Sequence, residues 1–339
     1  YHSIIFDNTL LSGQAGQPSL PYCAVQLLLP PGHVAVSVEF IGNQLITVEG
    51  QYSLYPQQAS RPLSEGNSGT FQKDESIYKS AETFPASHCG EHSTEFMNGH
   101  AIVLSTFTPV QYIPASGKIS YFKEVTIRVT TKASPEAEMA LANSPGREKP
   151  NNDLKRFIQN PSKLSAYQFE HSRTGTYDIL IVSPAAFESE FEGLQDLYLI
   201  RGYQSQFVSV EDIYSTMTGQ DDQEKIRNFI IQEYQSNNIE YVILGGDAEH
   251  VPYRGLYCYV ESGSGYESNN IPADLYYSAL DGTWNDDGDS RWGEIGEDDL
   301  LPDIAVARIP FSNSAELKKM LHKTTSNQDN PVPVKMNHV

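Results

Sequence analysis

Alternating apolar and polar positions dominate the first third of the chain. Val34, Val36, Val38 and Phe40 are separated by single smaller or polar residues, and residues 125–129 repeat this period of two. Because successive side chains of a strand point to opposite faces, this period predicts strands with one buried face. The predicted strands are Tyr22–Leu29, His33–Ile41, Gln44–Val48, His100–Phe107 and Ile119–Thr131, with Gly- and Pro-containing turns between them. We therefore expect an antiparallel β-sandwich over residues 1–131.

The composition shifts over residues 132–173. Ala, Ser, Pro, Asn, Glu and Lys prevail there with little periodicity, which is typical of an exposed linker between domains. Basic residues on such a linker are candidate points for proteolytic processing; they are Arg147, Lys149, Lys155, Arg156 and Arg173. A linker that is merely solvated explains the same composition.

From Tyr177 onward, short apolar runs alternate with amphipathic stretches. The apolar runs are typical of strands buried on both faces of a parallel sheet; they are Asp178–Val182, Gln206–Val210, Tyr241–Leu244 and Ile304–Val306. Helical apolar stripes lie between them: Phe187, Phe191, Leu194 and Tyr198, then Ile226, Phe229, Ile230 and Tyr234. Asp221 or Asp222 is expected to cap the second helix, and Asn313 a last one. The pattern predicts a parallel α/β domain over residues 174–339, and thus an α+β chain of two domains.

Polar residues follow the strand that ends at Leu244. In open α/β sheets, ligands collect at the carboxyl ends of the strands, so Asp247, Glu249 and His250 lie where a site is expected. His250 is either a general base or a residue that hydrogen-bonds within its turn.

Acidic residues outnumber basic ones by 43 to 23, which gives a net charge of −20. This charge argues against nucleic acid or an anionic membrane as a partner and favours cations or basic substrates, although it also serves solubility alone. No apolar run approaches the roughly 18 residues of a transmembrane helix. The sequence opens at Tyr1 without a signal peptide and stops at Val339, and we interpret it as a fragment of a longer protein.

One loop concentrates oxygen ligands. Six residues of the loop carry carboxylate or amide oxygens, and glycines allow it to fold: Asp281, Asn285, Asp286, Asp287, Asp289 and Glu294. Calcium takes six to eight oxygens at once, so the loop predicts a structural Ca²⁺ site. It is not an EF-hand, because the sixth position counted from Asn285 is Ser290 rather than Gly. A solvated acidic turn is the alternative reading.

Two weaker patterns lie in the β region. His88, Glu91 and His92 formally match an inverted zinc-protease motif, but that motif needs a helix and the context here is β-rich. Cys23 and Cys89 could pair in an exported protein, which would leave Cys258 free.

Three runs of sequence together resemble the gingipain-like cysteine peptidases, peptidase family C25. They are Tyr241-Val-Ile-Leu-Gly-Gly-Asp-Ala-Glu-His-Val-Pro252, Pro272-Ala-Asp-Leu-Tyr-Tyr277 and Pro302-Asp-Ile-Ala-Val-Ala-Arg-Ile-Pro310. The β region is similar to the propeptide of that family, through Pro18-Ser-Leu-Pro21 and the segment from Phe107 to Ile119. The resemblance covers nearly the whole chain.

The resemblance implies an exported zymogen, secreted or held at the cell surface. Its β domain would bind and inhibit its own caspase-like catalytic domain, which would cleave proteins or peptides. In such enzymes a Cys thiolate attacks the scissile carbonyl and a His activates it. No His-Gly pair occurs in this chain, and its three cysteines do not match the nucleophile. The dyad is therefore expected beyond residue 339.

The resemblance also implies that Asp303 orients the catalytic His, because it stands ahead of a Val-Ala-Arg strand. The alternative is a strand-start residue paired with Arg308 or with a backbone amide. Asp247 and Asp274 match family positions as structural or calcium-ordering groups. Two hypotheses follow: a segment of a cysteine endopeptidase precursor, or a non-catalytic, calcium-stabilised surface binding protein on the same scaffold.

Overall fold

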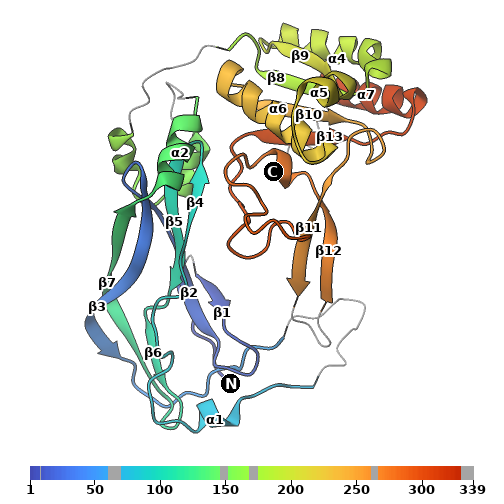
Figure 1. The fold of residues 1–339 in the computed structure, drawn as a ribbon. Helices are drawn as coiled ribbons and strands as arrows, with labels where there is room; N and C mark the ends of the chain where they lie inside the picture. The colour runs from blue at the N-terminus through green and yellow to red at the C-terminus, as the bar shows by residue number, and fades with distance from the viewer. Residues whose placement is uncertain (8, 60–69, 146–151, 168–174, 261–265, 330–339) are drawn as a thin grey trace.

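The computed structural model describes residues 1–7, 9–59, 70–145, 152–167, 175–260 and 266–329. A β-rich region forms the N-terminal part of the chain, and a sheet covered by helices forms the C-terminal part (Figure 1). Among the described residues, no helix is both long and apolar enough to cross a membrane.

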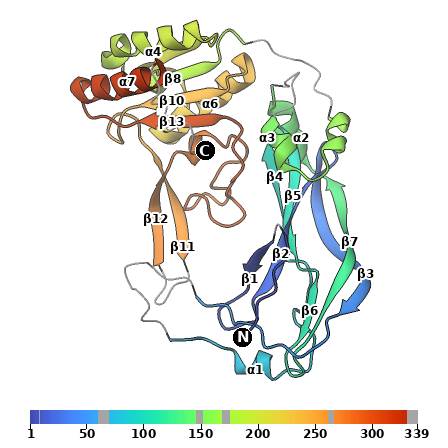
Figure 2. The same ribbon diagram turned by 180° about the vertical axis from the view of Figure 1, so that it is seen from behind.

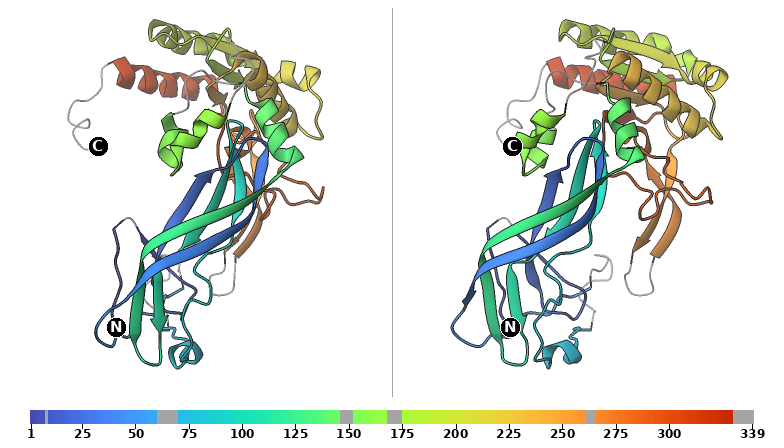
Figure 3. Two further views of the ribbon diagram at one scale, coloured as in Figure 1. Left: turned by 90° about the vertical axis from the view of Figure 1, so that its left-hand side faces the viewer. Right: turned by 60° about the vertical axis from the view of Figure 1, so that its left-hand side comes forward.

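Two antiparallel sheets make up the β region. One has the strand order β1-β2-β5-β4 and the other β3-β7-β6. Their bounds are β1 Leu10–Ser12, β2 Leu20–Leu28, β3 His33–Thr47, β4 Ser93–Met97, β5 His100–Phe107, β6 Val110–Ile113 and β7 Lys118–Ala133. The long strands β3 and β7 form a twisted ribbon, blue and green in Figure 3. Side chains from both sheets, including Phe96, Val103, Val38 and Val129, share one apolar cluster.

Strand β3 joins two strands that the sequence predicted as separate. Gly42 and Asn43 do not form a turn, because they pair with Val125 and Glu124 of β7 inside a continuous ladder. A side chain at position 42 would meet the Phe122 ring at 2.5 Å. Gly42 therefore makes room for an aromatic ring and does not turn the chain.

The described part of residues 132–173 is not the exposed linker that the composition of this range predicts. The segment contains the end of β7, helices α2 (Pro135–Asn143) and α3 (Asn152–Phe157), and a 3-10 helix, η2 (Pro161–Ala166). Leu154 is fully buried and Ile158 nearly so, in a cluster with Leu28 and Ile102 of the β region. These few apolar side chains are enough to anchor a segment of mostly polar composition to the β region. The candidate cleavage points Arg147, Lys149 and Arg173 lie outside the described residues, and Lys155 and Arg156 lie on α3.

The α/β region contains a parallel sheet with helices on both faces, in the order β13-β10-β8-β9. The strands are β8 Ile179–Ser183, β9 Ser205–Ser209, β10 Tyr241–Gly245 and β13 Ala305–Ile309. The helices are α4 Glu188–Ile200, α5 Val210–Thr216, α6 Asp222–Asn237 and α7 Ser314–Asp329, with a 3-10 helix, η3 (Ala185–Phe187), before α4. Figure 2 shows α4 and α7 together above the sheet and α6 below them.

Alternate side chains of β8 and β10 pack against different helices, on the two faces of the sheet. Ile181 and Ile243 pack with Phe191 of α4 and Leu317 of α7. Leu180, Val182, Val242 and Leu244 pack with Ile226 and Ile230 of α6 and Ile213 of α5. Burial on both faces explains why these strands appear as uninterrupted apolar runs.

The predicted helix caps are confirmed. Asp221 accepts a hydrogen bond from Glu224 N–H (2.8 Å) at the start of α6, and Asn313 accepts one from Glu316 N–H (3.1 Å) at the start of α7. The first turn of α6 thus begins at a defined residue, because a side-chain oxygen satisfies an otherwise unpaired N–H.

A hairpin and a long loop connect β10 with β13. Strands β11 (Arg254–Val260) and β12 (Tyr266–Ala273) pair antiparallel, and the 3-10 helix η4 (Leu275–Tyr277) follows. The loop from residue 278 to residue 304 then returns to the sheet, and Trp284 within it is fully buried. In the β region, a short helix α1 (Glu75–Tyr78) is capped by Asp74.

Candidate functional site

Hydrogen bonds from both regions of the chain hold Asp303 just before β13. Leu280 N–H donates to its Oδ2 (2.9 Å), and Asn98 N–H, from the turn between β4 and β5, donates to its Oδ1 (2.5 Å). Only 5% of Asp303 is exposed. Because the acceptor is a carboxylate and the donors are main-chain groups, these hydrogen bonds fix its orientation.

Asn98 is the centre of this contact, and sequence reasoning missed it. It is itself buried, with a positive φ of 52°, and it precedes Gly99 in the two-residue hairpin turn. Tyr234 on α6 donates its hydroxyl to Asn98 Oδ1 (3.1 Å), and Ser144 Oγ donates to Asn98 O (3.0 Å). Asn-Gly is a strong hairpin signal, so the turn was predictable from sequence, but its partner on the α/β region was not.

Arg308 pairs with Asp274 and not with Asp303. Its Nε and Nη2 donate to the two carboxylate oxygens of Asp274 at 2.7 and 2.6 Å, and Nη1 donates to the carbonyl oxygens of Gly246 and Val251. Bidentate pairing of this kind fixes geometry. Asp274 is therefore a structural residue that ties η4 to the end of β10, and the ion pair considered for Asp303 is not formed.

At the carboxyl edge of the sheet, Asp247 and His250 form a turn. Ser312 Oγ donates to Asp247 Oδ2 (2.5 Å), and this hydrogen bond is the main reason why the pKa of Asp247 is lowered. The His250 ring lies 3.2 Å from Ser312 O through Nε2 and packs against Phe187. These contacts favour the turn role for His250. Asp303 precedes its strand, so it lies at the opposite edge from these residues.

The predicted calcium loop divides into two groups. Oxygens of Asp287, Asp289 and Glu294 lie within 4.8 Å of one another near the surface. Asp281 instead joins Asp299 and Asp303, whose oxygens also lie within 4.8 Å of one another. Between the two groups lies Trp284, which is fully buried and has a positive φ of 66°.

The remaining predicted ligands lie beside the surface group. Asn285 donates its amide to Asp289 O (3.0 Å), while its Oδ1 is buried and lacks a hydrogen-bond partner. Asp286 accepts a hydrogen bond from Thr283 Oγ1. An orphaned amide oxygen beside clustered carboxylates fits an oxygen-liganded cation such as Ca²⁺.

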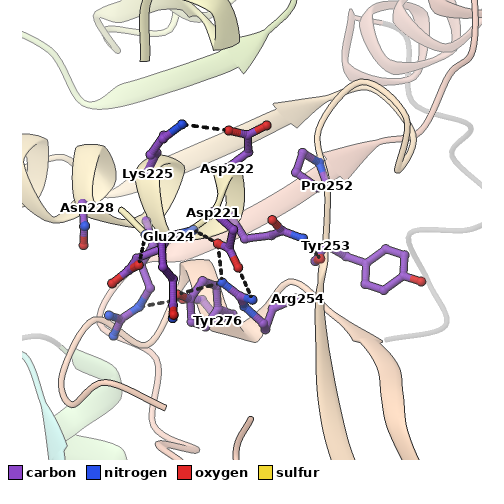
Figure 4. A network of polar contacts seen from close by, with 12 residues as sticks. Asp221, Asp222, Glu224, Lys225, Asn228, Pro252, Tyr253, Arg254 and Tyr276 are labelled. Atoms are coloured by element: carbon purple, nitrogen blue, oxygen red, sulfur yellow. Dashed lines mark hydrogen bonds and ion pairs between the residues drawn. The ribbon is translucent and has the colours of Figure 1, made fainter. Parts of the chain in front are cut away.

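The loop and the β11–β12 hairpin are attached to α6 by Arg254. Its guanidinium donates two 2.8 Å hydrogen bonds to Asp221 (Figure 4). It also lies 3.7 Å from the centre of the Trp292 ring and 4.6 Å from the centre of the Tyr276 ring. Burial alone would raise the pKa of Asp221, but hydrogen bonds from Arg254 and the Glu224 amide outweigh burial and lower it. This network positions the acidic loop relative to the sheet.

Cys23, Cys89 and the zinc-like motif lie in the β region, whereas Cys258 lies on β11. Cys23 and Cys89 are free cysteines. The backbone of each pairs with that of Phe107, from opposite sides of β5. Two inter-strand spacings of about 4.8 Å therefore separate them, more than a disulfide spans, and the pairing considered from sequence is wrong. Burial raises the pKa of both thiols. His88 lies in a bend and its ring stacks on that of Phe40, so the helix that the zinc motif needs is missing.

Two family models match the chain. The model described as peptidase family C25 matches residues 172–339, and the model of the C25 propeptide matches residues 4–143. The chain belongs to peptidase family C25. Its β region falls within the match to the C25 propeptide, and its α/β region falls within the match to the C25 peptidase.

Individual relatives of this C25 chain are distant. Gingipain R2 of Porphyromonas gingivalis is 26% identical over 152 residues, which are 43% of this chain and 19% of that protein. A structure on the zymogenic latency of gingipain K from the same organism is 18% identical, with a TM-score of 0.30, over 38% of this chain and 72% of that one. A complex of the pro- and mature domains of Porphyromonas gingivalis RgpB is 14% identical, with a TM-score of 0.34, over 47% of this chain and 79% of that one. The match covers about a fifth of the length of the curated relative.

Proposed function

We propose that this chain is the propeptide and first catalytic subdomain of a secreted C25 cysteine endopeptidase that is made as a zymogen. The supporting observation is Asp303, a buried carboxylate that backbone amides hold at the start of β13. The Cys and His that break the peptide bond would lie beyond residue 339, in a second subdomain of a caspase-like domain.

In this proposal Asp303 is a positioning residue. A carboxylate that accepts the Nδ1–H of the catalytic His selects the imidazole tautomer that can take the proton of the thiol. Leu280 N–H would continue to hold Oδ2 of Asp303, while Oδ1 would turn from Asn98 to the His.

Latency would follow from the same geometry. While the β4–β5 turn donates Asn98 N–H to Asp303 Oδ1, that oxygen is already engaged. The propeptide would thus bind its own catalytic domain at the carboxylate that the His needs. Removal of the β region would release this oxygen.

The uncovered edge of the parallel sheet is an argument for a further subdomain in this proposal. Strand β13 is one of the two edge strands of this sheet among the described residues, and β9 is the other. Beside it lies an apolar cavity of about 470 Å³, lined by Tyr241, Ala305 and Ala307 together with residues of α4 and α7. An edge strand with uncovered apolar surface is suited to pairing or packing with additional chain.

Calcium is part of the proposal as a structural ion of the surface loop. Asp287, Asp289 and Glu294 would supply carboxylates, and the orphaned Oδ1 of Asn285 an amide oxygen. A bound Ca²⁺ would neutralise repulsion in the loop and rigidify it. The chemistry assigned to Asp303 does not require this ion.

The test is to express the reading frame extended past Val339 and to assay peptide hydrolysis with and without a thiol-alkylating reagent. We expect activity that alkylation abolishes, and Asp303→Asn should lower kcat at least about 100-fold, with an altered pH profile. Asp298→Asn, which changes a nearby carboxylate outside the proposed machinery, is the control. A full-length product inert under all conditions would instead favour a non-catalytic, calcium-stabilised binding protein.

A further inference from the structure

A folded segment occupies the interval between the two family matches. The propeptide match ends at residue 143 and the peptidase match begins at residue 172, so neither match assigns a role to the residues between them. The largest described part of this interval is residues 152–167, which contain α3 and η2. We call residues 154–167 the strap. Its contacts with the β region are of two kinds, hydrogen bonds to a strand edge and apolar contacts in the interior.

The strap covers the outer edge of β2. Strand β1 pairs only with the first residues of β2. Farther along the same edge, Gln159 N–H donates to Gln26 O (2.8 Å), while the Gln159 side chain accepts from Gln26 N–H (3.0 Å) and donates to Ala24 O (2.9 Å). The Asn160 side chain accepts from Leu28 N–H (2.8 Å) and donates to Leu28 O (3.0 Å). These hydrogen bonds take the place of a neighbouring strand, and they close an edge that would otherwise be open to pairing.

The inner side of the strap is apolar and buried. Leu154 is fully buried and Ile158 is 4% exposed, and both belong to one apolar cluster with Leu28 and Ile102 of the β region. Leu301, which is 8% exposed, is the member of this cluster that comes from the α/β region. Side chains of the strap and of the β region therefore make up the apolar socket in which Leu301 is buried.

Tyr167 holds the last residue of the strap beside the β4–β5 turn. Its hydroxyl donates to Leu29 O (3.0 Å) and accepts from Ala101 N–H (3.1 Å). Its ring centre lies 4.4 Å from that of His100, which follows the turn that carries Asn98. A linker that only joins two domains is solvated and needs no such contacts.

We propose that the strap is an autoinhibitory element: the β region holds Asp303 only while the strap is bound to the β region. Leu301 lies two residues before Asp303, so the socket that buries Leu301 also keeps Asp303 beside Asn98, whose N–H donates to Oδ1 (2.5 Å). Without Leu154 and Ile158 the socket would be incomplete, and Leu301 would lose apolar contacts that favour its burial. The latency that follows rests on the proposed function, whereas the dependence of the contact on the strap does not.

The first test measures main-chain hydrogen exchange by NMR in this chain. Leu154→Ala removes a fully buried side chain of the socket and should speed the exchange of the Asn98 and Leu280 amides, which donate to Asp303, at least about 10-fold. Ser162→Ala, at an exposed position of the strap, is the control and should leave both rates unchanged. The proposal is overturned if Leu154→Ala speeds exchange only within the strap and β2, because the strap would then be a local cap.

A second variant keeps every apolar side chain of the socket and decides the case if Leu154→Ala loosens the whole protein. Gln159→Ala combined with Asn160→Ala should speed exchange of the Gln26 and Leu28 amides about 10-fold, because each loses its acceptor. The two amides that donate to Asp303 should exchange about 3-fold faster, because the strap is held less firmly. A response at β2 without one at these two amides would count against the proposal.

The consequence for latency is measured in the protein extended past Val339. Before any cleavage, Leu154→Ala should raise the peptide hydrolysis that thiol alkylation abolishes at least about 10-fold above the parent, and Ser162→Ala should not. A variant with faster exchange at Asn98 but unchanged latency would refute the autoinhibitory role. An extended protein that is inert even after release of the β region would refute the proposed function instead, and the exchange rates alone would then decide whether the contact depends on the strap.

Discussion

Replacing Asp221 by Asn should destabilise the α/β region by about 2–3 kcal/mol. Asn keeps the side-chain oxygen that caps α6 but loses the charge that faces Arg254. The Arg254 side chain is 6% exposed, so its charge would remain buried without a counterion. The guanidinium also lies against Trp292, which keeps it from moving into water.

The expected magnitude follows from the exposure of the two partners. Breaking a fully buried ion pair costs about 3–5 kcal/mol. The Asp221 side chain is 36% exposed, so water reaches one side of the pair and we reduce the expectation. Asp221→Ala additionally removes the helix cap, which should cost about 1 kcal/mol more.

Urea unfolding followed by tryptophan fluorescence measures these changes. Both tryptophans, Trp284 and Trp292, lie in the α/β region, so the signal reports on it. The control is Glu267→Gln, which breaks an exposed pair with Arg291 in the same region (side chains 51% and 40% exposed) and should cost less than about 1 kcal/mol. The reasoning is refuted if Asp221→Asn costs no more than Glu267→Gln.

Three other predictions concern particular contacts. Burial lowers the pKa of His100 below 6.5, so the folded state favours the neutral ring. The contribution of His100 to stability should therefore be complete above about pH 6.5 and be lost as the pH drops further, so His100→Phe should gain stability relative to the parent protein as the pH falls from about 7.5 to about 5 in unfolding experiments. Leu301→Ala should cost about 2–4 kcal/mol in urea unfolding, because Leu301 packs with Leu28 and Ile102 across the two regions, whereas the exposed neighbour Leu300→Ala should change stability by less than about 0.5 kcal/mol; equal effects would contradict the packing. Gly246→Ala should lower the melting temperature more than Gly282→Ala, because both positions have positive φ but only a Cβ at 246 meets another atom, His250 Cβ at 2.5 Å; the reverse order would be contrary to this reasoning.

Local patterns predicted much of the α/β region. The strands from residue 179 to residue 245 and the caps Asp221 and Asn313 agree with the sequence periodicity, because buried parallel strands and amphipathic helices leave signals within a few residues. In the β region, Gly42 was misread as a turn because Gly also occurs where a neighbouring ring needs space.

The candidate site depended on contacts that no local pattern encodes. Asn98 and Asp303 are 205 residues apart, and nothing near either residue indicates the other. Asp299 was overlooked in an acidic run, and Asp281 was grouped with the carboxylates of its own loop, although its oxygens lie near those of Asp299 and Asp303, which are distant in sequence. The helical segments within residues 132–173 were missed because only a few residues, such as Leu154 and Ile158, carry the burial.

The most direct test of the zymogen proposal is a time course of controlled proteolysis on the extended protein. Cleavage within residues 132–173 is followed on a gel while peptide hydrolysis is measured in the same samples. We predict that activity sensitive to thiol alkylation rises in step with loss of the intact chain, because the β region then no longer occupies Asp303. A protein that is equally active before cleavage, or inert after complete release of the β region, would contradict the proposal.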